Sequence, residues 1–320
     1  MSEKKRVLIT GATGFVGGHL IRALEEDGSS AFEIFGTTYP EIPSPSGSKL
    51  FFLDLRSEKD VIKLVGEVRP DWIFHLAAVS NVRHSWQMRN ETIETNVLGT
   101  HNLLEAVRQT APAARVLFIS SSDVYGFGAS PTEVLKEDAP FQIVSPYAYS
   151  KAAGEMLCGF YEKTENIDII IARPFPHTGP GQTAEFVCSD WARQVVQIER
   201  GDSAPILKVG NLEGRRDFCD VRDVVRAYLF LMRDGRRGEI YNVCSGRAIA
   251  LREVLDFLIK EAAGNTPISV EVDVAKLRKT DVHFPIGSNR KISDETGWSP
   301  RISIDQTLHD ILAFWRQRLK

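Results

Sequence analysis

The stretch "ITGATGFVGGHL", residues 9 to 20, decides the fold, because it places three glycines between an apolar run and an amphipathic segment. The run "RVLIT" at 6 to 10 is typical of a strand, and the residues that follow the glycines are typical of a helix. Glycines at such a turn let backbone amides approach a pyrophosphate, which the helix N-terminus then stabilises. A tight turn against a packed helix is the plain alternative. We predict a dinucleotide-binding turn at Gly11, Gly14 and Gly17.

Four more apolar runs follow at regular intervals: "FEIFGTT" at 32 to 38, "DWIFHLAA" at 71 to 78, "ARVLFISS" at 114 to 121 and "IDIIIARP" at 167 to 174. They lack polar alternation, as strands covered on both faces do. With the glycine turn they predict an α/β fold with a doubly wound parallel sheet, a Rossmann domain.

The pattern changes after about Arg173, where "RPFPHTGPGQ" forms a loop rich in Pro and Gly. We expect residues 1–172 to form the Rossmann domain, joined by about 218–245. We expect residues 173–217 and 246–320 to form a smaller, interlocked C-terminal substrate region. Apolar residues at helical spacing in 220–233 and 250–264 indicate helices that pack in the core.

Composition excludes several classes of protein. The 320 residues carry 39 basic and 42 acidic side chains, and the net charge of −3 argues against a nucleic-acid or membrane-surface partner. No apolar run approaches the roughly 20 residues of a membrane span, and "MSEKKRVLIT" enters a strand too soon for a signal peptide. Four scattered cysteines and seven histidines show no metal-ligand spacing. We expect a cytoplasmic protein with reduced cysteines and no metal.

The second strand ends in "GTTY" at 36 to 39, without the acid that often holds the adenosine ribose. No carboxylate would therefore repel a 2′-phosphate, and Thr37 and Thr38 could donate hydrogen bonds to one, with Arg56 as a further partner. This favours NADPH, with NADH tolerated. Asp54 could accept a hydrogen bond from the adenine amino group; a solvated Asp54 before a helix capped by Ser57 is the alternative.

The stretch "SPYAYSK" at 145 to 151 holds two tyrosines and a lysine. On a helix, residues four apart share a face, so Tyr147 and Lys151 meet while Tyr149 points elsewhere. A lysine ammonium beside a phenol favours the phenolate and lowers a pKa that starts near ~10. Tyr147 would then be a usable acid or base. For this pair alone, chance aromatics near a surface lysine are an equal explanation.

Further motifs supply the context: "ISSSDVYG" at 119 to 126, "HLAA" at 75 to 78 and "TNVLGT" at 95 to 100. With the glycine turn and the Tyr147–Lys151 pair, they make the chain resemble an extended short-chain dehydrogenase/reductase over essentially its whole length. The resemblance implies a catalytic triad of Ser121, Tyr147 and Lys151, in which the two hydroxyls bind the oxygen at the carbon that gains or loses hydride. Lys151 would also hold the nicotinamide ribose. The coenzyme contacts so implied are Gly11, Thr13, Gly14, Phe15, Val16, Gly17, Thr37, Asp54, Leu55, Ala77, Tyr147 and Lys151.

The second half resembles members of that family that act on GDP-sugars, through "RPFPHTGPGQ", "PILKVGNLEGRRDFCDVRD" and "YNVCSG". The similarity is greatest to GDP-6-deoxy-4-keto-mannose reductases, with GDP-mannose 4,6-dehydratases as close siblings. It implies NAD(P)H-dependent reduction of the 4-keto group of GDP-4-keto-6-deoxy-D-mannose to a GDP-6-deoxyhexose such as GDP-D-rhamnose, by a homodimer. The substrate contacts so implied are Ser122, His177, Lys208, Arg216 and Arg278. The two arginines suit a diphosphate because each guanidinium is a planar fork of donors, although surface salt bridges would explain them too.

Reductase and dehydratase differ at Asp123. Dehydratases of this group tend to read Thr-Ser-Glu where this chain reads "SSD" at 121 to 123. Aspartate is one methylene shorter than glutamate, and ~1 Å of misplacement costs about a hundredfold in rate. This favours the reductase over the dehydratase; a nucleotide-sugar epimerase or a non-catalytic NADP-sensing protein is a further alternative. Pro176 stands where the family usually has an asparagine that touches the nucleotide-sugar, and proline offers no donor.

Overall fold

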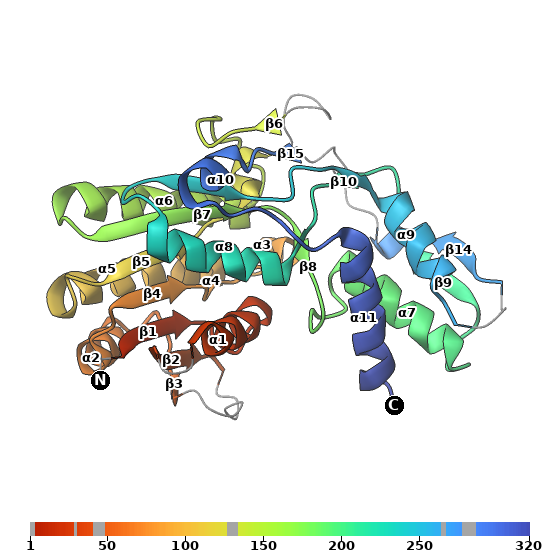
Figure 1. The fold of residues 1–320 in the computed structure, drawn as a ribbon, viewed down its shortest axis with the longest axis horizontal. Helices are drawn as coiled ribbons and strands as arrows, with labels where there is room; N and C mark the ends of the chain where they lie inside the picture. Colours follow the sequence, from red (N-terminus) through yellow and green to blue (C-terminus); the bar gives the residue numbers. More distant parts are fainter. Residues whose placement is uncertain (1–3, 29–30, 41–48, 127–133, 264–266, 277–285) are drawn as a thin grey trace.

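The computed structural model describes residues 4–28, 31–40, 49–126, 134–263, 267–276 and 286–320. A seven-stranded sheet lies at its centre (Figure 1), and every neighbouring pair of strands is parallel. The strand order is β12 (Ile240–Val243), β7 (Asp168–Pro174), β5 (Arg115–Ile119), β4 (Trp72–His75), β1 (Lys5–Thr10), β2 (Phe32–Thr38) and β3 (Lys49–Phe52). The chain thus winds outward from β1 to one edge and then from β4 to the other. This confirms the predicted doubly wound parallel sheet.

The central strands form where apolar side chains can be covered on both faces. All four residues of β4 and the last four of β1 are buried. Two strands are shorter than predicted, since 71–78 contains β4 only to His75 and 114–121 contains β5 only to Ile119. The residues that follow them leave the sheet at its carboxyl edge. Ligands bind at that edge in open α/β sheets.

Helices cover both faces of the sheet. One face packs against α1 (Phe15–Gly28) and α8 (Val221–Asp234), and the core between them includes Ile9, Leu20 and Tyr228. The other face packs against α2 (Glu58–Val68), α5 (Gly99–Thr110) and α6 (Pro146–Thr164). Beside α6 lie α3 (Val82–Gln87), α4 (Arg89–Ile93) and the π-helical turn η1 (Glu94–Leu98).

The smaller region has a core of its own, to the right of the sheet in Figure 1. It is built from α7 (Val187–Glu199), α9 (Leu251–Lys260) and α11 (Ile304–Arg318), with β9 (Ile206–Val209) paired to β14 (Ser269–Val272) and the turn η3 (Val274–Lys276). Among the residues described, no helix is long and apolar enough to cross a membrane.

The two regions exchange segments of chain. From the stretch 218–245, helix α8 packs on one face of the large sheet and strand β12 is its edge strand beside β7. Helix α10 (Arg290–Thr296) also packs against α8 and β12, although we predicted it in the smaller region, because Ile292 and Trp298 are fully buried there. Short pairs of strands complete the crossings: β8 (His177–Thr178) with β11 (Cys219–Asp220), β10 (Arg215–Arg216) with β13 (Ile249–Ala250), and β6 (Val134–Leu135) with β15 (Ile286–Gly287).

Candidate active site

The glycine turn between β1 and α1 is shaped for close backbone approach. Gly11 has φ +71°, and a Cβ there would lie 2.9 Å from the Cα of Ala77. A Cβ on Gly17 would lie 2.5 Å from the Gly11 carbonyl oxygen, so this glycine lets the helix pack on the turn. At Gly14 a Cβ would meet only that carbonyl, at 3.2 Å. The first amides of a helix have no partner within it. The turn therefore fits a dinucleotide pyrophosphate, with Thr13, Phe15 and Val16 at the helix start.

The two threonines at the end of β2 are turned into the protein. Thr37 and Thr38 are only 3% and 4% exposed. The Thr37 hydroxyl accepts a hydrogen bond from the Gly11 amide at 3.3 Å, and the Thr38 hydroxyl donates to the Pro40 carbonyl at 2.9 Å. The Thr13 hydroxyl oxygen lies 3.0 Å from the Thr38 hydroxyl oxygen. These hydroxyls thus brace the glycine turn, and the predicted donation from Thr37 and Thr38 to a 2′-phosphate stays a prediction.

Asp54 is bound by Arg56, two residues further on. The Arg56 side chain donates from Nε at 2.9 Å and from Nη2 at 2.7 Å, and holds the pKa of Asp54 below its ordinary value. Arg56 Nη2 also donates to the exposed Tyr39 hydroxyl at 3.0 Å. Ser57 is the N-cap residue of α2, but its side chain makes no cap hydrogen bond. Of the alternative reading, Ser57 does stand at the N-cap position, while Asp54 is 31% exposed and ion-paired, and its contact with adenine stays a prediction. Leu55, between them, is buried.

Helix α6 carries the tyrosine and lysine on one buried face. Ser145 caps the helix by accepting from the Ala148 amide at 3.0 Å, and Pro146 fits the first turn. Tyr147 is 8% exposed, whereas Tyr149 is 53% exposed. Lys151 Nζ lies 5.9 Å from the centre of the Tyr147 ring and donates to the Ile119 carbonyl at 2.7 Å. The spacing argument therefore selected the buried tyrosine.

The charge state of Tyr147 differs from the prediction. Burial raises the pKa of Tyr147 above its ordinary value, and the Asp123 charge adds to this, while a hydrogen bond with Ser121 acts the other way. Burial also lowers the pKa of Lys151 to about 8, although nearby Cys158 and Glu155 act the other way. The expected lowering of the Tyr147 pKa by Lys151 is wrong in this structure, because desolvation is the largest influence on this phenol and raises its pKa. Tyr147 therefore keeps its proton at neutral pH and can act as an acid.

Ser121 begins the short helix η2 (Ser122–Tyr125) directly after β5. Its hydroxyl accepts from the Asp123 amide at 3.1 Å and lies 3.2 Å from the Asp123 Oδ2. Gly126 ends the turn with φ +65°, where a Cβ would lie 2.5 Å from the Gln142 carbonyl oxygen. Ser121 is buried and Ser122 is half-buried. Burial and hydrogen bonding thus place the Ser121 hydroxyl beside Tyr147.

The predicted substrate residues differ in their surroundings. The His177 ring stacks on Phe15 with 6.4 Å between centres, so it lies beside the start of α1. Its Nδ1 lies 3.0 Å from the Phe175 carbonyl, and burial lowers its pKa. Arg216 is half-buried in β10 and donates to the Arg215 carbonyl at 2.8 Å. Lys208 is exposed in β9. Arg278 lies outside the described residues.

Asn96 is a site residue to which we gave no role from sequence. It is 3% exposed in η1, and its side chain accepts from the Val79 amide at 2.8 Å and donates to the Ser150 hydroxyl at 2.9 Å. It thereby ties the loop after β4 to α6 beside Lys151. An asparagine at a buried position of a helix was the available signal, because a buried amide needs partners.

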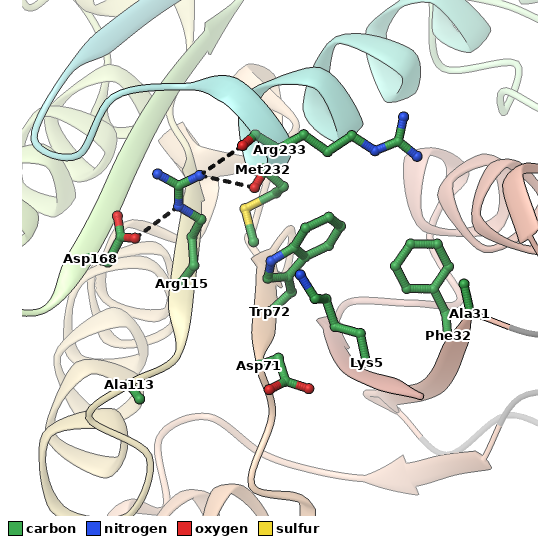
Figure 2. A pocket seen from close by; sticks show the side chains of 10 residues that line it. All are labelled: Lys5, Ala31, Phe32, Asp71, Trp72, Ala113, Arg115, Asp168, Met232 and Arg233. Carbon is green, nitrogen blue, oxygen red and sulfur yellow. Dashed lines mark hydrogen bonds and ion pairs between the residues drawn. The ribbon is translucent and has the colours of Figure 1, made fainter. Parts of the chain in front are cut away.

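A cavity of about 790 Å³ lies at the opposite edge of the sheet (Figure 2). It is lined by the first residues of five strands: Lys5, Phe32, Trp72, Arg115 and Asp168. Arg115 is engaged there by Asp168 at 2.9 Å and by the Met232 carbonyl at 3.0 Å. Because the glycine turn follows the last residue of β1 and the Ser121 segment follows β5, this cavity is separate from the candidate active site.

The described residues contain no group of three or more His, Cys, Asp or Glu side chains arranged to hold a metal ion. The four cysteines are free and buried: Cys158, Cys188, Cys219 and Cys244. Burial raises the pKa of each thiol. A thiol that keeps its proton is a poor nucleophile and metal ligand, so these side chains act as packing residues.

Known proteins share this chain's sequence and fold over nearly its full length. A family model described as GDP-mannose 4,6 dehydratase matches residues 8–311. GDP-6-deoxy-D-mannose reductase of Pseudomonas aeruginosa is 35% identical over 316 residues, 99% of either chain. The structure of RMD from P. aeruginosa complexed with NADPH matches with a TM-score of 0.86 and 34% identity, covering 98% of this chain and 100% of that one. GDP-mannose 4,6 dehydratase of Homo sapiens is 26% identical, over 95% of this chain and 90% of that protein. The chain therefore belongs to the GDP-mannose 4,6-dehydratase family of extended short-chain dehydrogenases/reductases.

Proposed function

We propose that this protein uses NADPH to reduce the 4-keto group of GDP-4-keto-6-deoxy-D-mannose, giving a GDP-6-deoxyhexose such as GDP-D-rhamnose. The observation that carries the proposal is the full-length similarity to a GDP-6-deoxy-D-mannose reductase, at 35% identity against 26% for the human dehydratase. The geometry agrees with it, because reduction of a ketone needs a proton donor and the Tyr147 hydroxyl lies beside Ser121 on the buried face of α6.

Each residue of the triad has a distinct part in this reduction. Bound NADPH would supply the hydride. Tyr147 would donate its phenolic proton to the substrate oxygen, and the Ser121 hydroxyl would hold the negative charge that develops there. Lys151 would hold the nicotinamide ribose from the same face of α6. The amides at the start of α1 would bind the pyrophosphate.

The preference for NADPH is part of the proposal. The related RMD structure holds NADPH, and residues 36–39, where β2 ends, contain no carboxylate. Thr37 and Thr38 are buried, and among the described residues near the end of β2 the Arg56 guanidinium and the exposed Tyr39 hydroxyl are further groups that could meet a 2′-phosphate. Arg56 also pairs with Asp54, which neutralises part of its charge, so we expect NADH to be used as well.

One observation favours the dehydratase as a second candidate. Asp123 lies close enough to Tyr147 for its charge to raise the tyrosine pKa, so a carboxylate does face the reacting groups. Its Oδ2 lies 3.2 Å from the Ser121 hydroxyl, however, and it is one methylene shorter than the glutamate of the dehydratases. Dehydration would need that group to move a proton on the far side of the sugar ring.

Two incubations separate these candidates. The purified protein is given GDP-4-keto-6-deoxymannose with NADPH, and separately GDP-mannose with catalytic NADP⁺, and the products are identified by NMR. We expect rapid NADPH oxidation in the first and no 4-keto-6-deoxy sugar in the second. Rapid dehydration of GDP-mannose would favour the dehydratase, and no turnover in either would contradict both. An enzyme that only epimerises would leave NADPH unconsumed.

We also propose a homodimer, formed through α6 and its neighbours. Tyr149, Met156 and Phe160 are 53%, 71% and 55% exposed at spacings that share one helix face, and Ile93 and Leu98 are 41% and 43% exposed on the adjoining α4 and η1. A second copy related by a twofold axis could cover this face with the same residues. Light scattering tests this: Met156→Glu should give a monomer, and a monomeric wild type would contradict the dimer.

A cytoplasmic location is the last part of the proposal. Four free, buried cysteines fit a compartment that keeps thiols reduced. Cell fractionation with an antibody to the protein checks this, and recovery in an extracytoplasmic fraction would contradict it.

A further inference from the structure

A buried ion pair lies behind the loop that carries Ser121. Glu155 stands on α6, one turn after Lys151, and Arg173 stands in β7; their side chains are each 3% exposed. Arg173 binds the carboxylate twice, from Nε to Oε1 at 2.9 Å and from Nη2 to Oε2 at 2.7 Å. Removing two charges from water is costly, so stability alone explains such a pair poorly.

The ion pair is bonded to the residues on both sides of segment 121–123. Before it, the Ser120 hydroxyl donates to Glu155 Oε1 at 2.5 Å. After it, the Tyr125 hydroxyl accepts from Arg173 Nη1 at 2.7 Å. Tyr125 then donates to Asn242 Oδ1 in β12 at 2.8 Å. The two ends of the segment are therefore held by one buried network.

The network also joins helix α6 to strand β7 and to the residue that follows strand β5. These elements must keep their relative positions for the reaction. Glu155 shares its helix with Tyr147 and Lys151. Ser120 follows the strand that leads to Ser121, and Arg173 is anchored in the sheet between that strand and β12. A shift of α6 relative to β5 would have to break the Ser120–Glu155 bond.

We propose that Glu155, Arg173 and Tyr125 are positioning residues that hold the Ser121 hydroxyl in line with the Tyr147 hydroxyl. They act through Ser120 and the η2 turn, outside the reacting groups. The inference rests on the proposed roles of Ser121 and Tyr147. The proposal also explains why a charge pair is buried here, although neither hydride transfer nor proton transfer uses Glu155 or Arg173 directly.

The test removes single hydroxyls and compares matched positions. Tyr125→Phe and Ser120→Ala each remove one bond to the ion pair. Tyr161→Phe is the control, because Tyr161 is 2% exposed on the same helix and its hydroxyl donates to Glu105 at 2.6 Å, away from the loop. For each variant kcat, KM, the Kd for NADPH and the thermal midpoint are measured with the 4-keto sugar as substrate.

We expect Tyr125→Phe and Ser120→Ala to lower kcat by roughly ten- to a hundredfold, the cost of misplacing a group by about 1 Å. The Kd for NADPH should stay within about twofold, because the glycine turn is untouched. Tyr161→Phe should lower the thermal midpoint by about as much as Tyr125→Phe and Ser120→Ala do, but it should leave kcat unchanged. When Tyr125→Phe is added to Ser121→Ala, kcat should fall little further than in Ser121→Ala alone. The reason is that Tyr125 acts through the Ser121 hydroxyl, which that variant already lacks.

Three results would overturn the proposal: a Tyr125→Phe enzyme with kcat within about twofold of wild type, an equal loss in Tyr161→Phe, or fully additive losses in the Ser121→Ala background. An active Tyr147→Phe enzyme is a different failure. It would overturn the assignment of the reaction itself, and the positioning role with it, while the first three results leave that assignment standing.

Discussion

Replacing Tyr147 by Phe removes one oxygen and tests the assignment of the proton donor. Burial raises the pKa of Tyr147, so the wild-type hydroxyl is fully protonated at pH 7 and the whole catalytic contribution is available for loss. A positioned general acid contributes about 10²- to 10⁴-fold in rate, or roughly 3 to 5 kcal/mol of barrier. We therefore expect kcat to fall by about that factor.

The fold should change little in the same variant. The ring is retained in a site that is 8% exposed, and the loss is one hydrogen bond with Ser121, worth about 1 kcal/mol. A shift of that size lowers the thermal midpoint by only about 2 to 4 °C. Tyr149→Phe is the matched control, because Tyr149 is two residues away on the same helix and 53% exposed.

The assay is the initial rate of NADPH oxidation with GDP-4-keto-6-deoxymannose, followed by absorbance, with the Kd for NADPH measured by fluorescence. Tyr147→Phe should bind NADPH within about threefold of wild type, and Tyr149→Phe should match wild type in both measurements. A Tyr147→Phe enzyme within about tenfold of the wild-type rate would refute the assignment. Loss of activity in Tyr149→Phe alone would show that the exposed ring is the reactive one.

Four other changes have expected outcomes. Arg56→Ala should weaken NADPH binding by about ten- to a hundredfold and NADH binding much less, since a charge-assisted phosphate contact is worth about 1.5 to 3 kcal/mol; equal losses in calorimetric titrations would contradict a 2′-phosphate contact. Arg216→Ala should weaken GDP-sugar binding by a similar factor and leave NADPH binding unchanged, and a loss for both ligands would indicate a misplaced site. Asp123→Glu should raise a trace of GDP-mannose dehydration, detected by NMR, and leave reduction largely unaffected; no gain would exclude reach as the limitation. The value of kcat/KM should fall above pH 8, because burial lowers the pKa of Lys151 to about 8 and the ammonium is present only below it; a profile flat to about pH 10 would contradict a role for the lysine charge.

Local patterns predicted the parts of the site that lie close together in the chain. The glycine turn and the shared face of Tyr147 and Lys151 follow from the geometry of a single turn and a single helix. The buried strands were recognisable because a strand covered on both faces has no polar alternation. The direction of the Tyr147 pKa shift could not be predicted from the sequence, because desolvation depends on how many distant segments cover the hydroxyl.

Other features required the tertiary structure because their partners are far apart in sequence. Thr37 accepts from the Gly11 amide 26 residues away, a contact that ties the end of β2 to the glycine turn. Arg173 pairs with Glu155 across 18 residues and reaches Tyr125 across 48. Nothing in the local pattern distinguishes a buried charge from an exposed one.

The sequence by itself determined the sheet, the glycine turn and which of the two tyrosines shares a helix face with Lys151, because each depends on periodicity or spacing over a few residues. The tertiary structure alone decided that burial raises the pKa of Tyr147, that Arg56 pairs with Asp54 and reaches Tyr39, and that a buried ion pair is bonded to both sides of the Ser121 segment. These outcomes depend on desolvation and on hydrogen bonds between distant segments, and both are properties of the packed chain.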